Sequence, residues 1–266
     1  MKYDPLISVR NLSITYYRDN TSISGINFSI SKGKVLGLAG ESGSGKSSIC
    51  KAILGLLHPG LTSVSGEIRF MGKNILSMSY EERRKINGKD IAFVMQNPMA
   101  AFDPCMKIKH HFSETLTAHL MCSKKDALHY AAEMLHRVGL SDVGRIMDSY
   151  PYMVSGGMLQ KVMLAIAVSL NPALIVADEP TTALDAESQS VILSLLQNIM
   201  REYRPAMLYV SHDMRILSLL SDNIAVMKDG HVIEMGCTKN VFENPEKRYT
   251  RELIAACSLM QEVASC

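Results

Sequence analysis

The chain has 266 residues, of which 47% are hydrophobic and 20% charged, and its formal net charge is +2. This composition is typical of a globular protein with one large domain or two modest ones, and the near-neutral charge argues against a dedicated nucleic-acid binder. The most apolar region, residues 162–177, is interrupted by polar residues and is shorter than the about 20 apolar residues that a membrane span needs.

The first predicted elements are strands. Alternating apolar residues over 12–16 and 26–30 predict half-buried strands. The apolar run 35–39 predicts a buried strand that leads into a glycine-rich loop and a helix. Further strand patterns lie at 66–70, 91–94, 174–177 and 207–210.

Helical patterns dominate between residues 97 and 155, for example over 125–138, which ends at Gly139. Near the C-terminus, Asp229-Gly230 between two apolar runs predicts a β-hairpin. A final helix is expected over much of 249–263. The pattern therefore predicts an α/β core that is interrupted by a helical insertion.

Residues Gly40–Ser47 match the phosphate-loop pattern G-x-x-x-x-G-K-[ST] in full, between a predicted strand and a predicted helix. Lys46 is expected to reach the β- and γ-phosphates of a nucleotide, and the Ser47 hydroxyl to bind Mg²⁺. The alternative, a glycine-rich turn with an incidental lysine, is disfavoured by these flanks. The predicted nucleotide-binding residues here are Gly40, Glu41, Ser42, Gly43, Ser44, Gly45, Lys46, Ser47 and Ser48.

A second nucleotide-site motif is the apolar strand 174–177, which is followed by Asp178 and Glu179. Asp178 is expected to hold Mg²⁺ through water, and Glu179 to polarise the attacking water as a general base. Many strands end in acidic residues, so this motif indicates a nucleotide site only in combination with the phosphate loop. A small GTPase is disfavoured because the two motifs lie far apart and no guanine-reading Asn-Lys-x-Asp is present.

The string Ser155-Gly156-Gly157 resembles the signature motif of ATP-binding-cassette (ABC) proteins, and the resemblance extends through nearly the whole chain. Gln96 resembles the family's Q-loop glutamine, which in the family senses the γ-phosphate and binds Mg²⁺. The segment Ala183-Leu184-Asp185 resembles the D-loop, and His212 resembles the switch histidine that acts in hydrolysis. Tyr16, with Tyr17 as the alternative, lies where the family stacks an aromatic ring on adenine.

The resemblance implies a P-loop NTPase fold: a RecA-like core with an antiparallel β subdomain, carrying an inserted α-helical subdomain. The whole chain, 1–266, would form one nucleotide-binding domain. Its core would comprise 1–96 and 156–238, its helical subdomain 97–155, and a short helical tail 239–266.

Two glycines at a helix start leave bare backbone that suits an anion, and Ser155 can cap the helix that follows. That helix carries an apolar stripe on one face, namely Leu159, Val162, Met163, Ile166, Ala167 and Leu170. In the family the signature contacts the γ-phosphate of ATP bound to the opposite subunit, which implies a head-to-tail dimer with two ATP molecules between the subunits. An ordinary capped helix is the alternative on local sequence alone.

Three details resemble the peptide- and nickel-importer ATPases: Met158 after the signature, residues 101–104, and the ending Asn244-Pro245…Tyr249-Thr250. Peptide-importer ATPases commonly carry a C-terminal extension, so uptake of nickel or a nickel–chelator complex is favoured over di- or oligopeptides. The remaining alternatives are an exporter motor, a non-transport ABC ATPase in DNA repair or translation, and a regulatory module without hydrolysis.

The resemblance also implies partners: a second ATPase subunit, expected to be a related but different chain, two membrane permeases and an external solute-binding protein. No nucleic-acid partner is expected, and ATP and Mg²⁺ are the expected cofactors. Six cysteines without ligand spacing, and a polar start over 1–5, favour the cytoplasmic face of the membrane. The scattered histidines, including the pair His110-His111, and the methionines are expected to be surface and core residues, not nickel ligands.

Overall fold

The computed structural model describes residues 5–19, 21–182 and 184–264. The chain divides into two compact units. The first comprises the residues up to Arg83 together with those from Ala206 onward, and the second is Arg84–Pro205. Helix α2 (Tyr80–Ile86) contains the first crossing from one unit to the other. The subdomain boundaries expected from the sequence stay a prediction.

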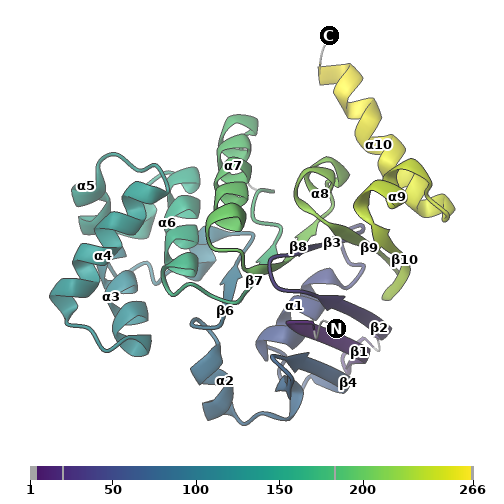
Figure 1. The fold of residues 1–266 in the computed structure, drawn as a ribbon, viewed down its shortest axis with the longest axis horizontal. Helices are drawn as coiled ribbons and strands as arrows, with labels where there is room; N and C mark the ends of the chain where they lie inside the picture. The colour runs from purple at the N-terminus through teal and green to yellow at the C-terminus, as the bar shows by residue number, and fades with distance from the viewer. Residues whose placement is uncertain (1–4, 20, 183, 265–266) are drawn as a thin grey trace. The chain divides into compact units, whose positions relative to one another are not determined.

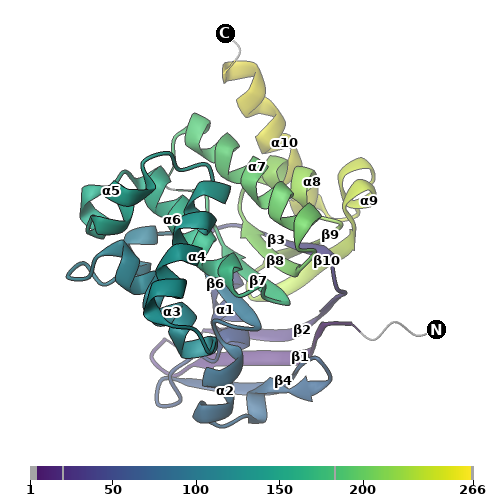
Figure 2. The same ribbon diagram turned by 60° about the vertical axis from the view of Figure 1, so that its left-hand side comes forward.

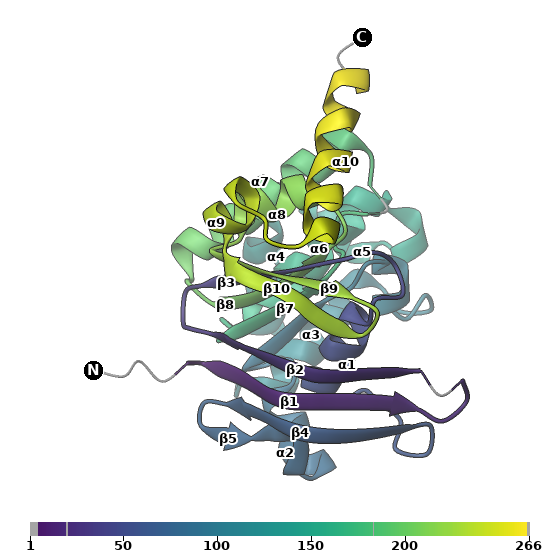
Figure 3. The same cartoon turned by 90° about the vertical axis from the view of Figure 1, so that its right-hand side faces the viewer.

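An antiparallel sheet in the first unit has the order β2-β1-β4-β5 (Figure 3). Its strands are β1 (Ile7–Tyr16), β2 (Ser22–Ile30), β4 (Thr62–Phe70) and β5 (Lys73–Asn74). In β2, Ile26, Phe28 and Ile30 are buried while the residues between them are exposed, which is the period-2 pattern of a sheet with one wet face. The alternating residues of the sequence thus predicted these strands correctly.

The remaining strands of this unit have the order β10-β9-β3-β8. They are β3 (Val35–Ala39), β8 (Ala206–Ser211), β9 (Asn223–Lys228) and β10 (His231–Cys237). Strand β3 pairs in parallel with both β8 and β9, and all five of its residues are buried. Its continuous apolar run is the pattern of a central parallel strand.

The predicted hairpin is confirmed by the antiparallel pair β9–β10. At its turn Asp229 has φ 47° and Gly230 has φ 77°. Two successive left-handed residues make the turn whose twist matches that of the flanking strands, and Asp-Gly is a preferred sequence for it.

The helices of the first unit are α1 (Lys46–Leu54), α8 (Met214–Leu220), α9 (Thr238–Glu243) and α10 (Arg248–Ala264), with a 3₁₀ turn η1 (Ile75–Ser77). Arg83 closes the C-terminal end of α1, where its guanidinium donates to Ile53 O at 2.7 Å and to Ala52 O at 3.0 Å. The last carbonyls of a helix lack amide partners one turn further on; here Gly55 N–H donates to Ala52 O at 3.2 Å, and the buried arginine donates to both carbonyls. Figure 1 shows α10 beginning beside α9.

The second unit combines a parallel strand pair, β6 (Ile91–Val94) and β7 (Leu174–Asp178), with a group of helices (Figure 2). The helices are α3 (Ile108–His119), α4 (Lys124–Arg137), α5 (Val143–Asp148), α6 (Gly156–Ser169) and α7 (Ala186–Glu202), with 3₁₀ turns η2 (Pro98–Ala101) and η3 (Pro151–Met153). The helix predicted over 125–138 is α4, capped by Ser123, whose hydroxyl accepts from Asp126 N–H at 3.2 Å.

Helix α6 is buried on more sides than the predicted stripe requires. Leu159, Val162, Met163 and Ala167 are buried, but Ile166 and Leu170 are only half-buried. The additional buried residues of this helix are Gln160, Leu164, Ala165, Val168 and Ser169. A single-faced helix was therefore the wrong expectation, because helices and strands surround α6. Among the described residues, none of the helices is both long and apolar enough for a membrane crossing.

Candidate functional site

The phosphate loop joins β3 to α1, and two of its glycines are required by close contacts with neighbouring residues. Gly40 has φ +148°, and a Cβ on it would lie 2.4 Å from the carbonyl oxygen of Met227. Gly45 has φ +104°, and a Cβ there would lie 2.7 Å from Cγ1 of Ile23. No larger residue fits either position without displacing its neighbours, so these glycines set the path of the loop.

Lys46, the lysine of the phosphate-loop motif, lies inside this loop. Its side chain is almost fully buried, and its Nζ donates to Gly40 O at 2.8 Å and to Glu41 O at 2.7 Å. The loop thus wraps around a buried positive charge. Ser44 Oγ is buried too, and it has no hydrogen-bond partner among the described residues. A buried ammonium inside a cradle of glycines suits a phosphate group.

Ser47 and Ser48 lie in the first turn of α1, where Ser48 N–H donates to Gly45 O at 3.1 Å. The Ser47 side chain is exposed, so its hydroxyl is open to a cation bound with phosphate. Ser48 Oγ lies 2.7 Å from the Tyr16 hydroxyl. This contact places Tyr16, at the end of β1, beside the start of α1, as an aromatic residue that stacks on a bound base would require. Tyr17 is 60% exposed.

Two parts of the C-terminal region contact the phosphate loop. In the β9–β10 turn, Gly230 N–H donates to Ser44 O at 3.3 Å. At the start of α10, the Tyr249 hydroxyl accepts from Glu41 N–H at 3.2 Å. Tyr249 was not among the residues predicted for the site. The resemblance of 242–253 to an importer ending gave the only signal at this position, and it does not reveal the contact.

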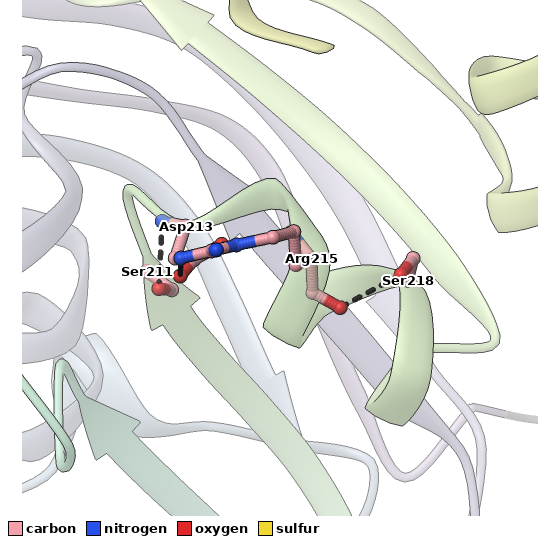
Figure 4. A network of polar contacts seen from close by, with 4 residues as sticks. All are labelled: Ser211, Asp213, Arg215 and Ser218. Atoms are coloured by element: carbon pink, nitrogen blue, oxygen red, sulfur yellow. Dashed lines mark hydrogen bonds and ion pairs between the residues drawn. The ribbon is translucent and has the colours of Figure 1, made fainter. Parts of the chain in front are cut away.

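His212 follows β8 in the first unit and is exposed. The next residue, Asp213, caps α8 and is fixed by a short network (Figure 4). Its N–H donates to Ser211 Oγ at 3.0 Å, and its carboxylate forms a two-point ion pair with Arg215. Burial opposes the charged form of Asp213, but the Arg215 side chain and the amides of α8 outweigh it and hold the pKa of Asp213 below its ordinary value.

In the second unit, Asp178 ends β7 and Glu179 follows it, both half-buried. Glu179 has φ 47°, in the left-handed region that non-glycine residues rarely adopt. The Thr182 hydroxyl donates to Glu179 Oε2 at 2.9 Å. An unusual backbone conformation at a carboxylate of this kind is common at catalytic sites, where the surrounding structure holds the strain.

Gln96 is exposed in the segment between β6 and η2. The signature residues lie at the start of α6, where Ser155 Oγ accepts from Met158 N–H at 3.3 Å. This hydrogen bond confirms the predicted cap. A Cβ on Gly156 would meet open space, and one on Gly157 would lie 3.1 Å from Ser188 Oγ. At Gly156 the helix therefore begins with exposed backbone that an anion can approach, whereas Ser188 lies beside Gly157.

Asp185 is expected to contact nucleotide, and in this structure it caps α7. Its carboxylate accepts from Ser188 N–H and from the Ser188 hydroxyl, both at 2.8 Å. The backbone bond and then the side-chain bond from Ser188 lower the pKa of Asp185. Ala183, the first residue of the predicted D-loop, lies outside the described residues.

The predicted site residues fall on both units. Tyr16, the phosphate loop and His212 belong to the first, where the loop, the start of α1 and the end of β1 come together. The second unit carries the other predicted residues, namely Gln96, Ser155, Gly156, Gly157, Asp178, Glu179 and Asp185. Residues 23–182 match the ABC transporter family. The chain belongs to that family.

Sequence identity to individual relatives indicates which group of ABC proteins the chain resembles. The chain is 43% identical over 251 residues to the metal-staphylopine import system ATP-binding protein CntD of Staphylococcus aureus (strain Mu50 / ATCC 700699), covering 94% of this chain and 92% of the relative. It is 36% identical over 261 residues to the oligopeptide transport ATP-binding protein OppD of Bacillus subtilis (strain 168), covering 96% of this chain and 73% of that one. The resemblance to the peptide/nickel importer group is thereby confirmed.

Solved structures of ABC ATPases resemble this chain in fold. The ATP-binding cassette MJ0796, in a dimeric post-hydrolysis state bound to ADP and phosphate, superposes with a TM-score of 0.77 at 27% identity, covering 87% of this chain and 98% of that one. The cbiO1 protein of Clostridium perfringens, part of the cbiONQ transporter complex, has a TM-score of 0.75 at 27% identity, covering 99% and 100%. The predicted α/β P-loop NTPase fold is confirmed. The chain is an ATP-binding subunit of an ABC importer, and this family hydrolyses ATP to drive transport.

Proposed function

We propose that this chain powers the uptake of nickel or a nickel–chelator complex through separate permease subunits. The observation that carries the proposal is the 43% identity to a metal-staphylopine import ATPase over nearly the full length of both chains. Uptake of di- or oligopeptides is the second candidate, because oligopeptide transport ATPases are 36% identical over a similar span.

The first unit supplies the groups that bind the nucleotide in this proposal. Tyr16 stacks on adenine, and the backbone of Gly40–Ser47 surrounds the phosphates. Lys46, which donates to two loop carbonyls in this structure, turns to the β- and γ-phosphate oxygens when ATP is bound. His212 stabilises the γ-phosphate region during hydrolysis.

In this proposal the second unit supplies groups that hydrolyse the bond between the β- and γ-phosphates of ATP. The Glu179 carboxylate accepts a proton from water as it attacks the γ-phosphorus, and the Thr182 hydroxyl orients that carboxylate. Gln96 and Asp178 of this unit, together with Ser47 of the first, would offer the oxygen ligands that Mg²⁺ prefers. Gln96 would also sense the γ-phosphate. Mg²⁺ bound with ATP would neutralise charge that develops on the phosphate oxygens.

The signature residues Ser155, Gly156 and Gly157 would contact the γ-phosphate of ATP bound to a second ATPase subunit, and Asp185 would lie at that interface. We propose that this subunit is a related but different chain, arranged head to tail with this one. The exposed Gly156 at the start of α6 supports the assignment, because a glycine places no side chain between the helix N-terminus and an approaching anion. Two membrane permeases and an external solute-binding protein would complete the importer, with this chain peripheral at the cytoplasmic face of the membrane.

Uptake assays test the transported substrate. In cells that lack this chain, we expect wild type to restore accumulation of radiolabelled nickel supplied with staphylopine, and the isosteric variant Glu179→Gln to fail. Uptake of a radiolabelled tripeptide should not depend on the chain. If tripeptide uptake depends on it and nickel uptake does not, the peptide alternative replaces this proposal. If neither depends on it although the purified chain hydrolyses ATP, import of both substrates is excluded.

A further inference from the structure

The outer edge of the phosphate loop is held by residues from the far end of the chain. Glu41, the second residue of the loop, directs its backbone N–H to the Tyr249 hydroxyl at 3.2 Å. On the other side of that peptide, the Gly40 and Glu41 carbonyls accept from the Lys46 ammonium. The backbone around Glu41 is therefore fixed from both sides, by the ammonium that would meet phosphate and by the phenol of α10.

Tyr249 is itself held in place at the start of α10. The Glu234 carboxylate on β10 accepts from Glu246 N–H at 2.9 Å and from Lys247 N–H at 3.1 Å, in the segment that enters the helix. Burial opposes the charge on Glu234, but the nearby Thr250 side chain and the hydrogen bonds from these two amides hold its pKa below the ordinary value. A carboxylate at this end of a helix also interacts favourably with the helix dipole.

The Tyr249 ring is packed as well as bonded. It is 9% exposed, and the Lys228 ammonium at the end of β9 lies 4.6 Å from its centroid. A cation over a tyrosine face is favourable and restricts the ring. Tyr249 is thus fixed to β9 through its ring and to β10 through its helix. Burial raises the pKa of the phenol, so it is neutral when it accepts from the loop.

We propose that Tyr249 is a positioning residue for the phosphate loop: its hydroxyl holds the Glu41 amide and thereby fixes the loop in its phosphate-binding path. The first helical turn of the C-terminal segment is then part of the nucleotide site, and Glu234 acts on ATP affinity through Tyr249. The inference concerns ATP binding and is independent of whether the importer carries nickel or peptides.

The variant Tyr249→Phe tests the proposal because it removes the acceptor oxygen and keeps the ring and its contact with Lys228. With the full chain we expect affinity for ATP and ADP to fall about three- to tenfold, the effect of one lost hydrogen bond. The Glu41 amide resonance in a ¹⁵N-correlated NMR spectrum should shift. The matched control is Tyr80→Phe, since Tyr80 is 78% exposed on α2, and it should change neither readout.

A double variant separates positioning from general stabilisation. Glu234→Gln alone should weaken ATP binding, and Glu234→Gln combined with Tyr249→Phe should bind ATP no more weakly than Tyr249→Phe does. An unchanged nucleotide affinity and an unmoved Glu41 resonance in Tyr249→Phe would overturn the proposal, as would fully multiplicative losses in the double variant. A lower unfolding midpoint with unchanged affinity would mark Tyr249 as merely structural. Wild type that failed to bind ATP would instead contradict the family activity.

Discussion

The Asp213 carboxylate and the Arg215 guanidinium form a two-point ion pair directly after His212, with Oδ2–Nη2 at 2.7 Å and Oδ1–Nε at 3.0 Å. The same carboxylate caps α8 through Arg215 N–H at 2.9 Å. Because Asp213 is adjacent to His212 in the chain, this ion pair restricts the backbone conformation next to the histidine. The ion pair should therefore affect hydrolysis more than it affects ATP binding.

The variant Asp213→Asn keeps an acceptor for the helix cap and loses the ion pair. We expect the free energy of unfolding to fall by about 1 kcal/mol or less, since the Arg215 side chain is 43% exposed and solvent screens the pair. The rate of ATP hydrolysis should fall by a larger factor than ATP affinity, measured by steady-state kinetics and equilibrium binding. Ser218→Ala, on the same helix, is the control for α8 stability. Equal losses of rate and affinity would contradict this role.

Removal of the Glu179 carboxylate should separate binding from hydrolysis. In Glu179→Gln we expect ATP binding to be retained and turnover to fall at least about 100-fold, because the variant lacks the proton acceptor for the attacking water. Trapping of a closed dimer in the presence of ATP is the second expected result. Glu187→Gln, an exposed carboxylate in the first turn of α7, serves as the matched control. Turnover equal to wild type would refute the role of Glu179.

A side chain at Gly40 should disrupt the phosphate loop. Gly40→Ala places a Cβ 2.4 Å from a backbone oxygen, so the loop must move, and we expect ATP affinity to fall more than about tenfold. Gly72→Ala is the control, because Gly72 has φ +79° and an added Cβ there would meet nothing within 4 Å. That variant should lose only about 1–2 kcal/mol of stability to left-handed strain and keep its ATP affinity. Isothermal calorimetry with ATP gives both affinities.

Arg83 should matter for stability and not for chemistry. Burial lowers the pKa of its guanidinium, which nevertheless stays charged. Arg83→Met leaves the carbonyls of Ile53 and Ala52 without this donor, and we expect a loss of about 1–3 kcal/mol in the free energy of unfolding. The neighbouring Arg84 is exposed, and Arg84→Met should stay within about 0.5 kcal/mol of wild type. Urea unfolding measures both, and equal curves for the two variants would disprove the cap.

Glu234 predicts how acid affects the C-terminal support of the loop. Its pKa is lower in the folded chain than in the unfolded one, so its contribution to stability is complete above about pH 4.3 and is lost as pH falls through the folded pKa. The stability difference between wild type and Glu234→Gln should therefore be largest near neutral pH and vanish under acid. Unfolding curves measured from neutral to acid pH check this. A stability difference between wild type and Glu234→Gln that stayed constant over this pH range would contradict a lowered pKa at Glu234.

Local patterns predicted much of this molecule. The phosphate loop, the acidic end of β7 and the hairpin at Asp229-Gly230 depend on neighbours in sequence, so short motifs identify them. The cap at Ser155 is equally local, because it depends on three successive residues before an apolar run. Each of these predictions was possible because the structure concerned forms within a few successive residues.

Contacts over long sequence distances explain what the sequence did not reveal. The hydrogen bond between Glu41 and Tyr249 and the bond from Arg83 to the end of α1 join segments that are far apart in sequence. Their proximity follows only from the order of the strands in the sheets. The left-handed backbone of Glu179 has no signal in composition, since non-glycine residues reach it only when surrounding structure imposes it. The single stripe assigned to α6 was too narrow because nothing local to the helix reports how many neighbours cover it.

The turn at Asp229-Gly230 has a consequence for protein synthesis. The ribosome releases the phosphate loop before it releases the turn that donates to Ser44 O and the helix that carries Tyr249. Chains grow and begin to fold from the N-terminus. A nascent chain therefore carries a complete nucleotide motif that lacks these supports until the turn and the start of α10 have been synthesised, and on the proposed role of Tyr249 full ATP affinity arises only then.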